Sequence, residues 1–257
     1  MVEKCDRFVE QKMIKLAIIG YGQMGKMIEK LAANYDFEVV SRIDPRLGTE
    51  ICPKDLNDAE IAVEFTQPDT AFANICKCVE LGVKVVSGTT GWHEHLLKLK
   101  NFVADKGGSV VYGSNFSPGM NKFYEIVRAA AQIMKNMKDY DVYGYEMHHK
   151  YKKDSPSGTA KNLAKILINE LPQKDKVIYD SLQRIKADDE FHFASVRSGN
   201  IPGEHRIGFD SEYDSIELRH TARSREGLAV GALLAAAWLS NKQGLYEFKE
   251  VLAGGKD

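Results

Sequence analysis

Short apolar runs alternate with longer amphipathic segments along the first half of the chain. The runs are mostly aliphatic, which is typical of strands that are buried on both faces of a parallel sheet. The segments between them repeat apolar residues at helical spacing, as in KMIEKLAANY after the first run. This alternation predicts strands at residues 15–19, 37–43, 61–65, 83–86 and 109–112, with helices after the first strand and at residues 69–81 and 94–104.

The pattern changes after the stretch NFSPG at residues 115–119. One long helix is predicted at residues 121–137 and a second at residues 157–171, which ends before Pro172. The strand-like runs of this half have little helix between them, and a helix of small apolar residues at 227–239 closes the pattern. The predicted strands are residues 141–147, 177–179, 191–196, 205–209 and 215–221.

These patterns indicate two domains of different type. Strands that alternate with helices predict an α/β domain with a Rossmann-like, doubly wound parallel sheet. The second half predicts an α+β domain with an open mixed or antiparallel sheet. Because the last helix suits packing against the first domain, we expect one domain from residues 1–116 and 226–257 and the other from residues 117–225.

Composition and charge exclude several classes of function. Lys and Arg total 35 against 36 Asp and Glu, so the net charge of −1 predicts no nucleic-acid surface. The longest apolar run, Leu228–Leu239, is too short to span a bilayer, and the N-terminal residues lack the apolar core of a signal peptide. The cysteines fit neither a zinc ribbon nor a disulfide framework, so we expect a reduced, cytoplasmic protein; they are Cys5, Cys52, Cys76 and Cys78.

A glycine-rich loop joins the first predicted strand to the first helix. Glycines there permit a tight turn and a close approach of the backbone to a pyrophosphate at the helix N-terminus. Asp44 ends the second strand, where a carboxylate accepts hydrogen bonds from the adenosine ribose. Strand, loop, helix and acid together predict a dinucleotide site at Gly20, Tyr21, Gly22, Gln23, Met24 and Gly25.

The form of the dinucleotide depends on the charges around Asp44. A carboxylate repels a 2′-phosphate, which favours NADH. Arg42 and Arg46 flank Asp44, and either could pair with the 2′-phosphate of NADPH or lie as solvated charge at the strand end. We expect NADH, with tolerance for NADPH.

Two further loops follow strands of the same sheet, where doubly wound folds bind their ligands. Each is a plain turn when taken alone, but its place on the sheet favours contact with the nicotinamide half of the cofactor. The first loop contains Gly88, Thr89 and Thr90; the second contains Gly113, Ser114, Asn115 and Phe116, whose amide and aromatic side chains could flank the ring.

The stretch EMHHKYKKDSPSGTA, residues 146–160, gathers histidines and lysines before a helix. Neighbouring residues of a strand point to opposite faces, so His148 and His149 would not chelate one ion, and we expect no metal. Lys150 and Lys153 are predicted to be solvated residues of a loop. The favoured interpretation of this stretch is a site that binds a small anionic substrate and transfers a proton.

Proton transfer to an anionic substrate requires an acid and a cation beside an anion site. His148 titrates near neutral pH and can act as a general acid. Lys152 has the same strand parity as His148 and would supply a fixed positive charge to the same face. Ser157 is a plausible N-cap, and the free amides of Gly158 and Thr159 form a site of carboxylate size.

The ordered motifs GYGQMG, GTTGW, SNFSPGMN and EMHHKYKKDSPSGTA resemble the 4-hydroxy-tetrahydrodipicolinate reductase (dihydrodipicolinate reductase) family from Ile14 onward. The resemblance implies NAD(P)H-dependent reduction of a small dicarboxylate in diaminopimelate and lysine biosynthesis. It also implies a cytoplasmic homotetramer assembled through the sheets of its substrate-binding second domain. Gln23 and Tyr151 depart from the family pattern, where arginine and histidine are common.

The resemblance also implies roles for individual residues. His148 would donate the proton and Lys152 would be the catalytic cation, while His149, Gly158 and Thr159 would bind the carboxylates of the substrate. If both histidines serve one site, the strand must end at about His148. From the two-domain layout we also expect the domains to close over the substrate, because hydride transfer needs the nicotinamide ring, the substrate and His148 together with water excluded.

Other functions remain open from the residues alone. One is a different NAD(P)-dependent oxidoreductase that acts on a carboxylated sugar or amino acid. Another is a non-catalytic regulator that responds to NADH and keeps the fold. Arg225 returns the chain to the first domain and either couples cofactor binding to closure or forms a surface salt bridge, and His192, His205 and His220 are read as structural or exposed.

Overall fold

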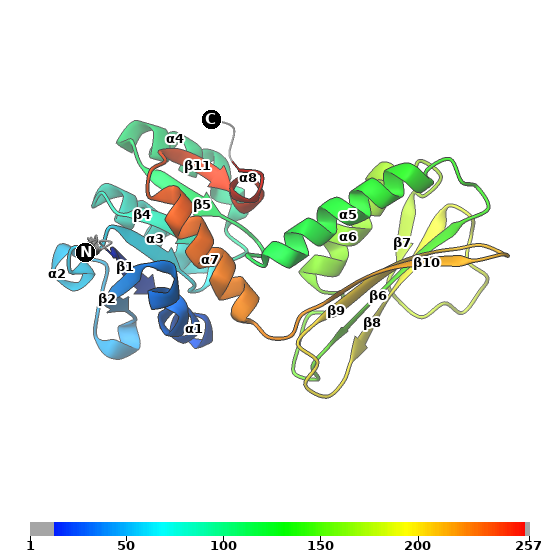
Figure 1. The fold of residues 1–257 in the computed structure, drawn as a ribbon, viewed down its shortest axis with the longest axis horizontal. Coiled ribbons are helices and arrows are strands. Elements are labelled where there is room, and N and C mark those ends of the chain that lie inside the picture. The colour runs from blue at the N-terminus through cyan, green and yellow to red at the C-terminus, as the bar shows by residue number, and fades with distance from the viewer. Residues whose placement is uncertain (1–12, 255–257) are drawn as a thin grey trace, which may run out of the picture. The chain divides into compact units, whose positions relative to one another are not determined.

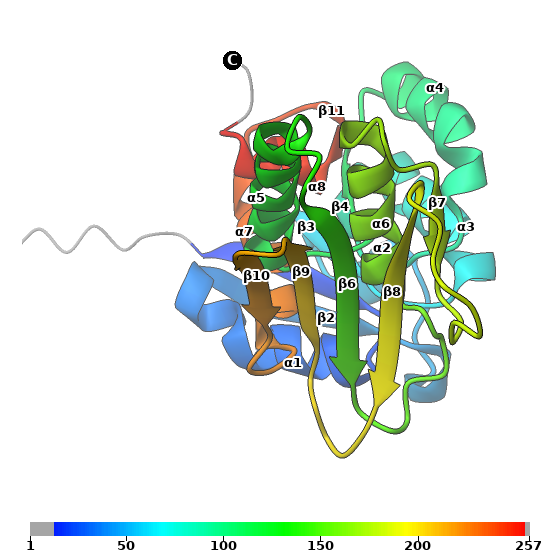
Figure 2. The same ribbon diagram turned by 90° about the vertical axis from the view of Figure 1, so that its right-hand side faces the viewer.

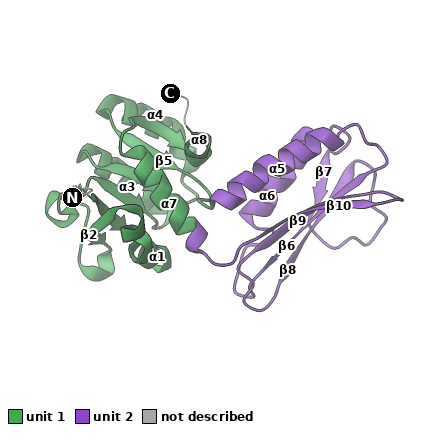
Figure 3. Ribbon diagram, viewed as in Figure 1, with its two compact units in different colours: residues 1–117, 228–257 green, residues 118–227 purple. Residues whose placement is uncertain are grey.

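The computed structural model describes residues 13–254, so the prediction for the first twelve residues, including Cys5, lies outside the described residues. The chain forms two compact units (Figure 3). Unit 1 is the described part of Met1–Ser117 and Leu228–Asp257, and unit 2 is Pro118–Gly227. Each unit has its own hydrophobic core, so each is described by itself.

Unit 1 alternates strands with helices, as the apolar runs predict (Figure 1). Two segments at its C-terminal end, β11 and α8, were not predicted. The strands are β1 (Ile14–Ile19), β2 (Phe37–Ile43), β3 (Ile61–Glu64), β4 (Lys84–Ser87), β5 (Ser109–Tyr112) and β11 (Gly244–Glu247). The helices are α1 (Gln23–Ala32), α2 (Pro53–Leu56), α3 (Pro68–Glu80), α4 (Leu96–Lys106), α7 (Glu226–Leu239) and α8 (Phe248–Leu252), with 3₁₀ turns at Ala33–Tyr35, Pro45–Leu47 and His93–His95.

The six strands of unit 1 form one parallel sheet in the order β11-β5-β4-β3-β1-β2. The chain runs from β1 outward to β2 and then crosses back to β3 on the other side of β1. This reversal makes the carboxyl ends of β1 and β3 the topological switch point, where ligands of doubly wound folds bind. The Rossmann-like prediction for this half is therefore confirmed.

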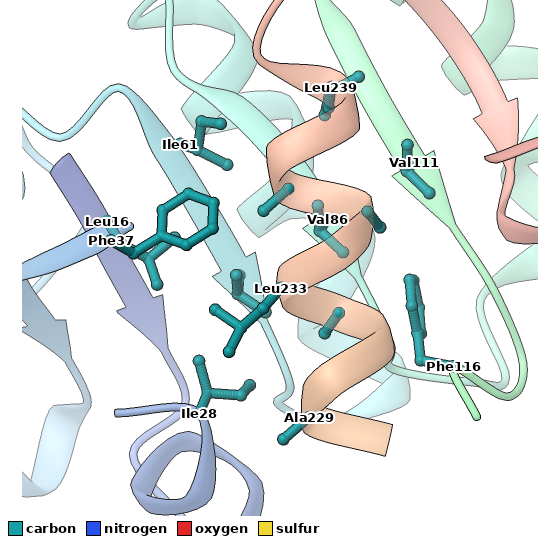
Figure 4. Packing of buried hydrophobic residues seen from close by; sticks show 14 of the residues in the cluster. Leu16, Ile28, Phe37, Ile61, Val86, Val111, Phe116, Ala229, Leu233 and Leu239 are labelled. Atoms are coloured by element: carbon teal, nitrogen blue, oxygen red, sulfur yellow. The ribbon is translucent and has the colours of Figure 1, made fainter. Parts of the chain in front are cut away.

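Helices cover both faces of this sheet. Alternate residues of β1 enter two separate cores: Leu16 and Ile18 pack with α1 and α7, whereas Ala17 and Ile19 pack with α3 and α4. Helix α7 is apolar on nearly all sides and lies across the first of these faces, with Leu233 and Leu239 directed into the core (Figure 4). Gly231 of α7 lies so close to the loop after β5 that an added Cβ would sit 1.6 Å from the Phe116 carbonyl oxygen.

Unit 2 packs two helices on one face of an open mixed sheet (Figure 2). Strand β6 is antiparallel to β9 and parallel to β8, so the sheet is mixed, as predicted. The strand order is β10-β9-β6-β8-β7. The elements are α5 (Pro118–Met134), β6 (Asp141–His148), α6 (Gly158–Glu170), β7 (Lys176–Ile178), β8 (Glu190–Arg197), β9 (Glu204–Asp210) and β10 (Ser215–Thr221).

Within residues 13–254, no helix combines the length and the apolar character needed to cross a membrane. Helix α7 comes nearest in composition, and its burial in the core of unit 1 explains that composition.

Gly231→Ala is expected to lower the free energy of unfolding of unit 1 by about 2–3 kcal/mol, because the new methyl group would force the α7 backbone away from Phe116. Gly227→Ala at an exposed position of the same helix is the matched control, where alanine favours the helix by up to about 1 kcal/mol. Urea unfolding followed by tryptophan fluorescence reports on unit 1, which contains both Trp92 and Trp238. An unchanged midpoint for Gly231→Ala would contradict the close approach.

Candidate functional site

The three loop glycines after β1 have different reasons to lack a side chain. Gly20 has φ +89°, and a Cβ there would lie 2.1 Å from the Phe65 carbonyl oxygen after β3. A Cβ on Gly25 would lie 2.5 Å from the Gly20 carbonyl oxygen, so this glycine lets α1 pack against the turn. Gly22 is the N-cap of α1, and a Cβ there would meet nothing within 4 Å. The open space at Gly22 fits a pyrophosphate at the helix N-terminus.

The carboxylate of Asp44 is buried at the end of β2 and faces this loop. It accepts the Tyr21 backbone N–H at 3.0 Å and the Arg46 backbone N–H at 3.0 Å. The Arg46 guanidinium also donates to it, at 2.8 and 2.5 Å, and holds the pKa of Asp44 well below its usual range. Asp44 therefore stays ionised, and it ties the loop after β1 to the loop after β2.

A cavity of about 740 Å³ opens at the switch point of unit 1. The loops after β1, β2 and β3 line it, through residues that include Gly20, Gly22, Asp44, Phe65 and Thr66. Its position and lining fit the adenosine and pyrophosphate portions of a dinucleotide.

The loop after β4, predicted to meet the nicotinamide, is anchored by a buried carboxylate. Glu64 is fully buried and accepts hydrogen bonds from Ser87 Oγ at 2.6 Å and Thr89 Oγ1 at 2.9 Å. A Cβ on Gly88 would lie 2.1 Å from the Phe65 ring, so the backbone passes directly over that ring. The Thr89 side chain thus holds the loop in place, while Thr90 is exposed.

The loop after β5 carries the second predicted nicotinamide contact. The ring of Phe116 is buried in the core and lies 4.6 Å, centroid to centroid, from that of Phe248. A Cβ on Gly113 would lie 3.0 Å from Phe248 Cβ. Ser114 is exposed, and Asn115 Oδ1 accepts the Ser117 backbone N–H at 2.8 Å. The aromatic ring therefore supports the loop from within, and cofactor contact by these residues stays a prediction.

In unit 2, one sheet face changes from apolar to polar along its length. Gly144 of β6 lies opposite Phe193 and Ile207 in the core, whereas Glu146 lies opposite Ser195 of β8 and His205 of β9. His148, two residues further along β6, lies on the same face by the alternation of strand side chains. The polar end of this face, formed by Glu146, His148, Ser195, Arg197 and His205 together with Ser157 at the start of α6, is called the β6 cluster below.

Glu146 is at the centre of the β6 cluster and is fully buried. Its Oε1 accepts the Ser157 backbone N–H at 2.9 Å, Arg197 Nη2 at 2.8 Å and Ser195 Oγ at 3.0 Å. Its Oε2 accepts the Ser157 hydroxyl and lies 3.4 Å from His148 Nδ1 and 3.3 Å from His205 Nε2. Donors from these residues hold the pKa of Glu146 well below its usual range despite its burial.

His148, the predicted proton donor, is buried at the end of β6 with 8% of its surface exposed. Burial lowers its pKa to about 4, against the opposing influence of Glu146. Its Nδ1 faces Glu146 without an aligned hydrogen bond to any described residue. In the ligand-free chain His148 is therefore neutral at pH 7, and a bound anion would favour its protonation.

The prediction that Lys152 shares the strand parity of His148 is wrong, because β6 ends at His148 and the chain turns through Lys150 and Tyr151. The end of β6 confirms the expectation that the strand stops at about His148 if both histidines serve one site. Lys152 Nζ lies in the following loop, 2.7 and 2.9 Å from the carboxylate oxygens of Asp154. It lies near enough to His148 to oppose protonation of that ring.

The predicted anion site begins α6. Ser157 is the N-cap, and its hydroxyl accepts the Ala160 backbone N–H at 3.1 Å. The first-turn amides of Gly158 and Thr159 have no carbonyl one turn earlier to bond. Gly158 is exposed, and a Cβ there would meet nothing within 4 Å. These amides suit a carboxylate of a small ligand.

His149 is half-buried beside the same loop, and its Nε2 lies 3.2 Å from Arg225 Nη2. The structure therefore brings Arg225 to the motif in unit 2, a contact that the sequence did not indicate. Lys150 and Lys153 are exposed, as predicted.

Three members of the β6 cluster could hold a metal ion by distance alone: Glu146, His148 and His205. The sequence indicated neither Glu146 nor His205 as a partner of His148 in such a group. Arg197 and Ser157 already donate to both oxygens of Glu146, and a guanidinium at 2.8 Å opposes a cation there. The donor set therefore fits a proton-handling cluster better than a metal site.

Sequence reasoning missed Glu146, Ser195, Arg197 and His205 as site residues. Glu146 stands two residues before His148, so strand alternation alone could have placed both on one face. The other three come from β8 and β9, and only the strand register brings them opposite β6. His205, read as structural or exposed, is 4% exposed and belongs to the cluster.

His148 is expected to titrate near pH 4 in the ligand-free protein, because burial disfavours its charged form. Between pH 4 and the ordinary value of 6.5 the unfolded chain binds a proton here that the folded chain does not. Its contribution to stability is thus complete above pH 6.5 and is lost as the pH falls toward 4. NMR titration of the ring, with His148→Asn to assign the signal, measures this; a pKa of 6.5 or above would contradict the burial argument.

Comparison with known proteins shows the family of the chain. A family model described as "Dihydrodipicolinate reductase, N-terminus" matches residues 14–116, and one described as "Dihydrodipicolinate reductase, C-terminus" matches residues 119–252. The chain is 40% identical to a 4-hydroxy-tetrahydrodipicolinate reductase of Christiangramia forsetii, over 93% of this chain and 98% of the relative. It is 36% identical to one of Methanocorpusculum labreanum, over 93% and 99%.

Solved structures show the same fold. A dipicolinate-bound dihydrodipicolinate reductase from Paenisporosarcina sp. TG-14 matches with a TM-score of 0.72 at 21% identity, over 93% of this chain and 99% of that one. An amine dehydrogenase of Mycobacterium smegmatis shares the architecture less closely, with a TM-score of 0.59 at 12% identity, over 92% and 95%. The two family models together span nearly all described residues, and the chain belongs to the dihydrodipicolinate reductase family of pyridine-nucleotide-dependent oxidoreductases.

Proposed function

We propose that the chain reduces 4-hydroxy-2,3,4,5-tetrahydrodipicolinate to 2,3,4,5-tetrahydrodipicolinate with NAD(P)H, in diaminopimelate and lysine biosynthesis. The observation that carries the proposal is the end of β6, where the buried His148 and the N-cap of α6, Ser157, both lie against the carboxylate of Glu146. The names of the relatives support the substrate. Overall, one hydride and one proton are added and the hydroxyl group leaves as water.

The two units divide the work in this proposal. Unit 1 binds the dinucleotide through the loop at Gly20–Gly25 and through Asp44, and the loops at 88–90 and 113–116 serve the nicotinamide half. The bound cofactor supplies the hydride. Unit 2 binds the substrate, and the reaction requires both units. The fit of the glycine loop to a pyrophosphate supports the assignment of unit 1.

In unit 2, His148 donates the proton and Lys152 supplies fixed positive charge. His149, Ser157, Gly158 and Thr159 hold the carboxylates of the substrate. Bound carboxylates raise the pKa of His148 from its value near 4, because two negative charges favour the imidazolium. When substrate binds, the Lys152 ammonium pairs with a substrate carboxylate in place of Asp154, because one ammonium cannot face both carboxylates equally.

NADH is the favoured cofactor, with NADPH tolerated. Arg42 donates to Glu29 and Arg46 donates to Asp44, so both arginines beside the ribose site already have carboxylate partners. A 2′-phosphate would have to compete with these partners and would lie near the ionised Asp44. These contacts support the preference that Asp44 predicts from the sequence.

We also propose a cytoplasmic homotetramer that assembles through the sheet of unit 2. Exposed apolar residues on that sheet, such as Val196 and Ile216, support an interface there. Sedimentation velocity distinguishes a tetramer from the 28.8 kDa chain.

The activity is tested by coupling the dihydrodipicolinate synthase reaction to this protein and following the absorbance of NADH and NADPH separately. We expect oxidation of both, with the larger kcat/KM for NADH. Oxidation only with a carboxylated sugar or amino acid would indicate a different reductase. No oxidation with any of these substrates, together with measurable NADH binding, would indicate a regulator.

His148→Gln and Lys152→Met are each expected to lower kcat by a factor of roughly 10²–10⁴, as for a lost acid–base group. Lys150→Met is the matched control for charge, because Lys150 is exposed in the same loop. Steady-state kinetics measure these effects. Wild-type turnover in both His148→Gln and Lys152→Met would refute the assigned roles.

A further inference from the structure

Glu146 is the one carboxylate of the β6 cluster, and the proposed reaction assigns it no role. We propose that Glu146 is a positioning residue that holds His148 and the first turn of α6 in a single arrangement, with Nδ1 of the imidazole turned toward the carboxylate and Nε2 left to deliver the proton. This inference rests on the proposed function for its kinetic consequences. The orientation of His148 and the anchoring of Ser157 concern unit 2 alone.

The contacts of Glu146 divide between its two oxygens. Oε1 is occupied by the Ser157 backbone N–H, Ser195 and Arg197, at 2.8–3.0 Å. Oε2 accepts the Ser157 hydroxyl and faces both imidazoles. The carboxylate therefore joins β6, β8, β9 and α6 at one point, and the acid and the anion site share one anchor.

Fold stability alone does not account for such a group. A buried ion pair is often no more stabilising than well-packed apolar residues of similar volume, because two charges must leave water. Two residues earlier on the same face, at Gly144, Phe193 and Ile207, the neighbouring positions are filled by apolar packing. The change to a fully buried glutamate occurs where the face reaches His148, which points to a role in the chemistry.

The surroundings of the two ring nitrogens show how the His148 ring is oriented. Nδ1 lies 3.4 Å from Glu146 Oε2, within ion-pair distance but without hydrogen-bond alignment. Nε2 lies beside Gly203, where a Cβ would be 3.1 Å away. The missing side chain at Gly203 leaves space at Nε2, and catalytic hydrogen bonds that are long in a free enzyme tighten when ligand binds. A carboxylate behind Nδ1 stabilises the imidazolium, as in other acid–base sites that pair histidine with an acid.

The charged groups around His148 make the carboxylate necessary. His205 on β9, Lys152 in the following loop and Arg197 on β8 all disfavour protonation of His148, and burial acts in the same direction. Glu146, on the same strand, is the group that favours it. Without this charge, the acid form of His148 would be rarer at any given pH.

The test is Glu146→Gln, which keeps the shape and removes the charge. We expect kcat to fall by roughly 10- to 1,000-fold while the KM for NADH stays unchanged, because unit 1 is untouched. The limb of the pH–rate profile that reports the acid should move to lower pH, and lower pH should restore part of the lost turnover. In NMR titration of the ligand-free protein, the pKa of His148 should fall below that of the wild type.

Glu190→Gln is the matched control. Glu190 is also a buried glutamate of this sheet, bonded to Arg184 and Lys176 at the opposite end of β8 from the cluster. It should leave both the pH profile and the titration of His148 unchanged. A Glu146→Gln protein with an unchanged profile and an unchanged His148 pKa would overturn the proposal, whatever its stability.

Glu146→Gln leaves the half-buried Arg197 guanidinium with less compensating charge, and the variant could lose its fold for that reason. The double variant Glu146→Gln/Arg197→Met removes that charge; because Arg197 itself disfavours protonation of His148, the pH profile and the His148 pKa of the double variant are compared with those of Arg197→Met alone, which keeps Glu146. The NMR titration needs no substrate, so it separates the two proposals. A lowered His148 pKa in a protein that reduces no dicarboxylate would retain the positioning role and refute the activity.

Discussion

The bond between the Glu146 carboxylate and Ser157 is the constraint on which the site in unit 2 depends. Ser157 is at once the N-cap of α6 and the start of the proposed anion site, and its backbone and hydroxyl both donate to a carboxylate on β6. Because the carboxylate is fully buried, water does not compete for these bonds.

Unit 1 also contains a buried glutamate that holds a loop, although its fold is different. Glu64 ends β3 as Glu146 lies near the end of β6, and both are fully buried. Glu64 binds the hydroxyls of Ser87 and Thr89 and so holds the loop after β4 beside the switch point. In each unit, hydroxyl and amide donors from neighbouring loops meet a buried carboxylate at the carboxyl end of a central strand. The loop after β4 and the first turn of α6 are thereby held in place by polar contacts.

The sequence predicted the architecture well because the signals were strong. The aliphatic runs and the glycine loop placed the strands of the first sheet and its switch point, and Ser157 and Pro172 marked a helix. Strand β11 was missed because Gly244–Glu247 is short and only half-buried, so its pattern resembles a loop. The start of α5 was placed at Asn121 instead of Pro118, although proline commonly occupies the first turn.

The site was harder to predict for two physical reasons. Strand register pairs Glu146 with Ser195 and His205, and nothing local in the sequence encodes that pairing. The parity argument for Lys152 failed because it extended β6 past His148, where the backbone turns. Similarly, Phe116 follows a strand of the nucleotide sheet but its ring enters the core. Residue types near a strand end are therefore easier to predict than the directions in which they point.

The path of the chain through unit 1 has a consequence for synthesis. One face of its sheet is covered by α7, and its edge is completed by β11, both of which come after the whole of unit 2 in the sequence. As the chain leaves the ribosome, unit 2 is complete while the first sheet still has an open apolar face. Unit 2 can therefore fold first, while the part of the first sheet that α7 covers stays open until α7 has been made.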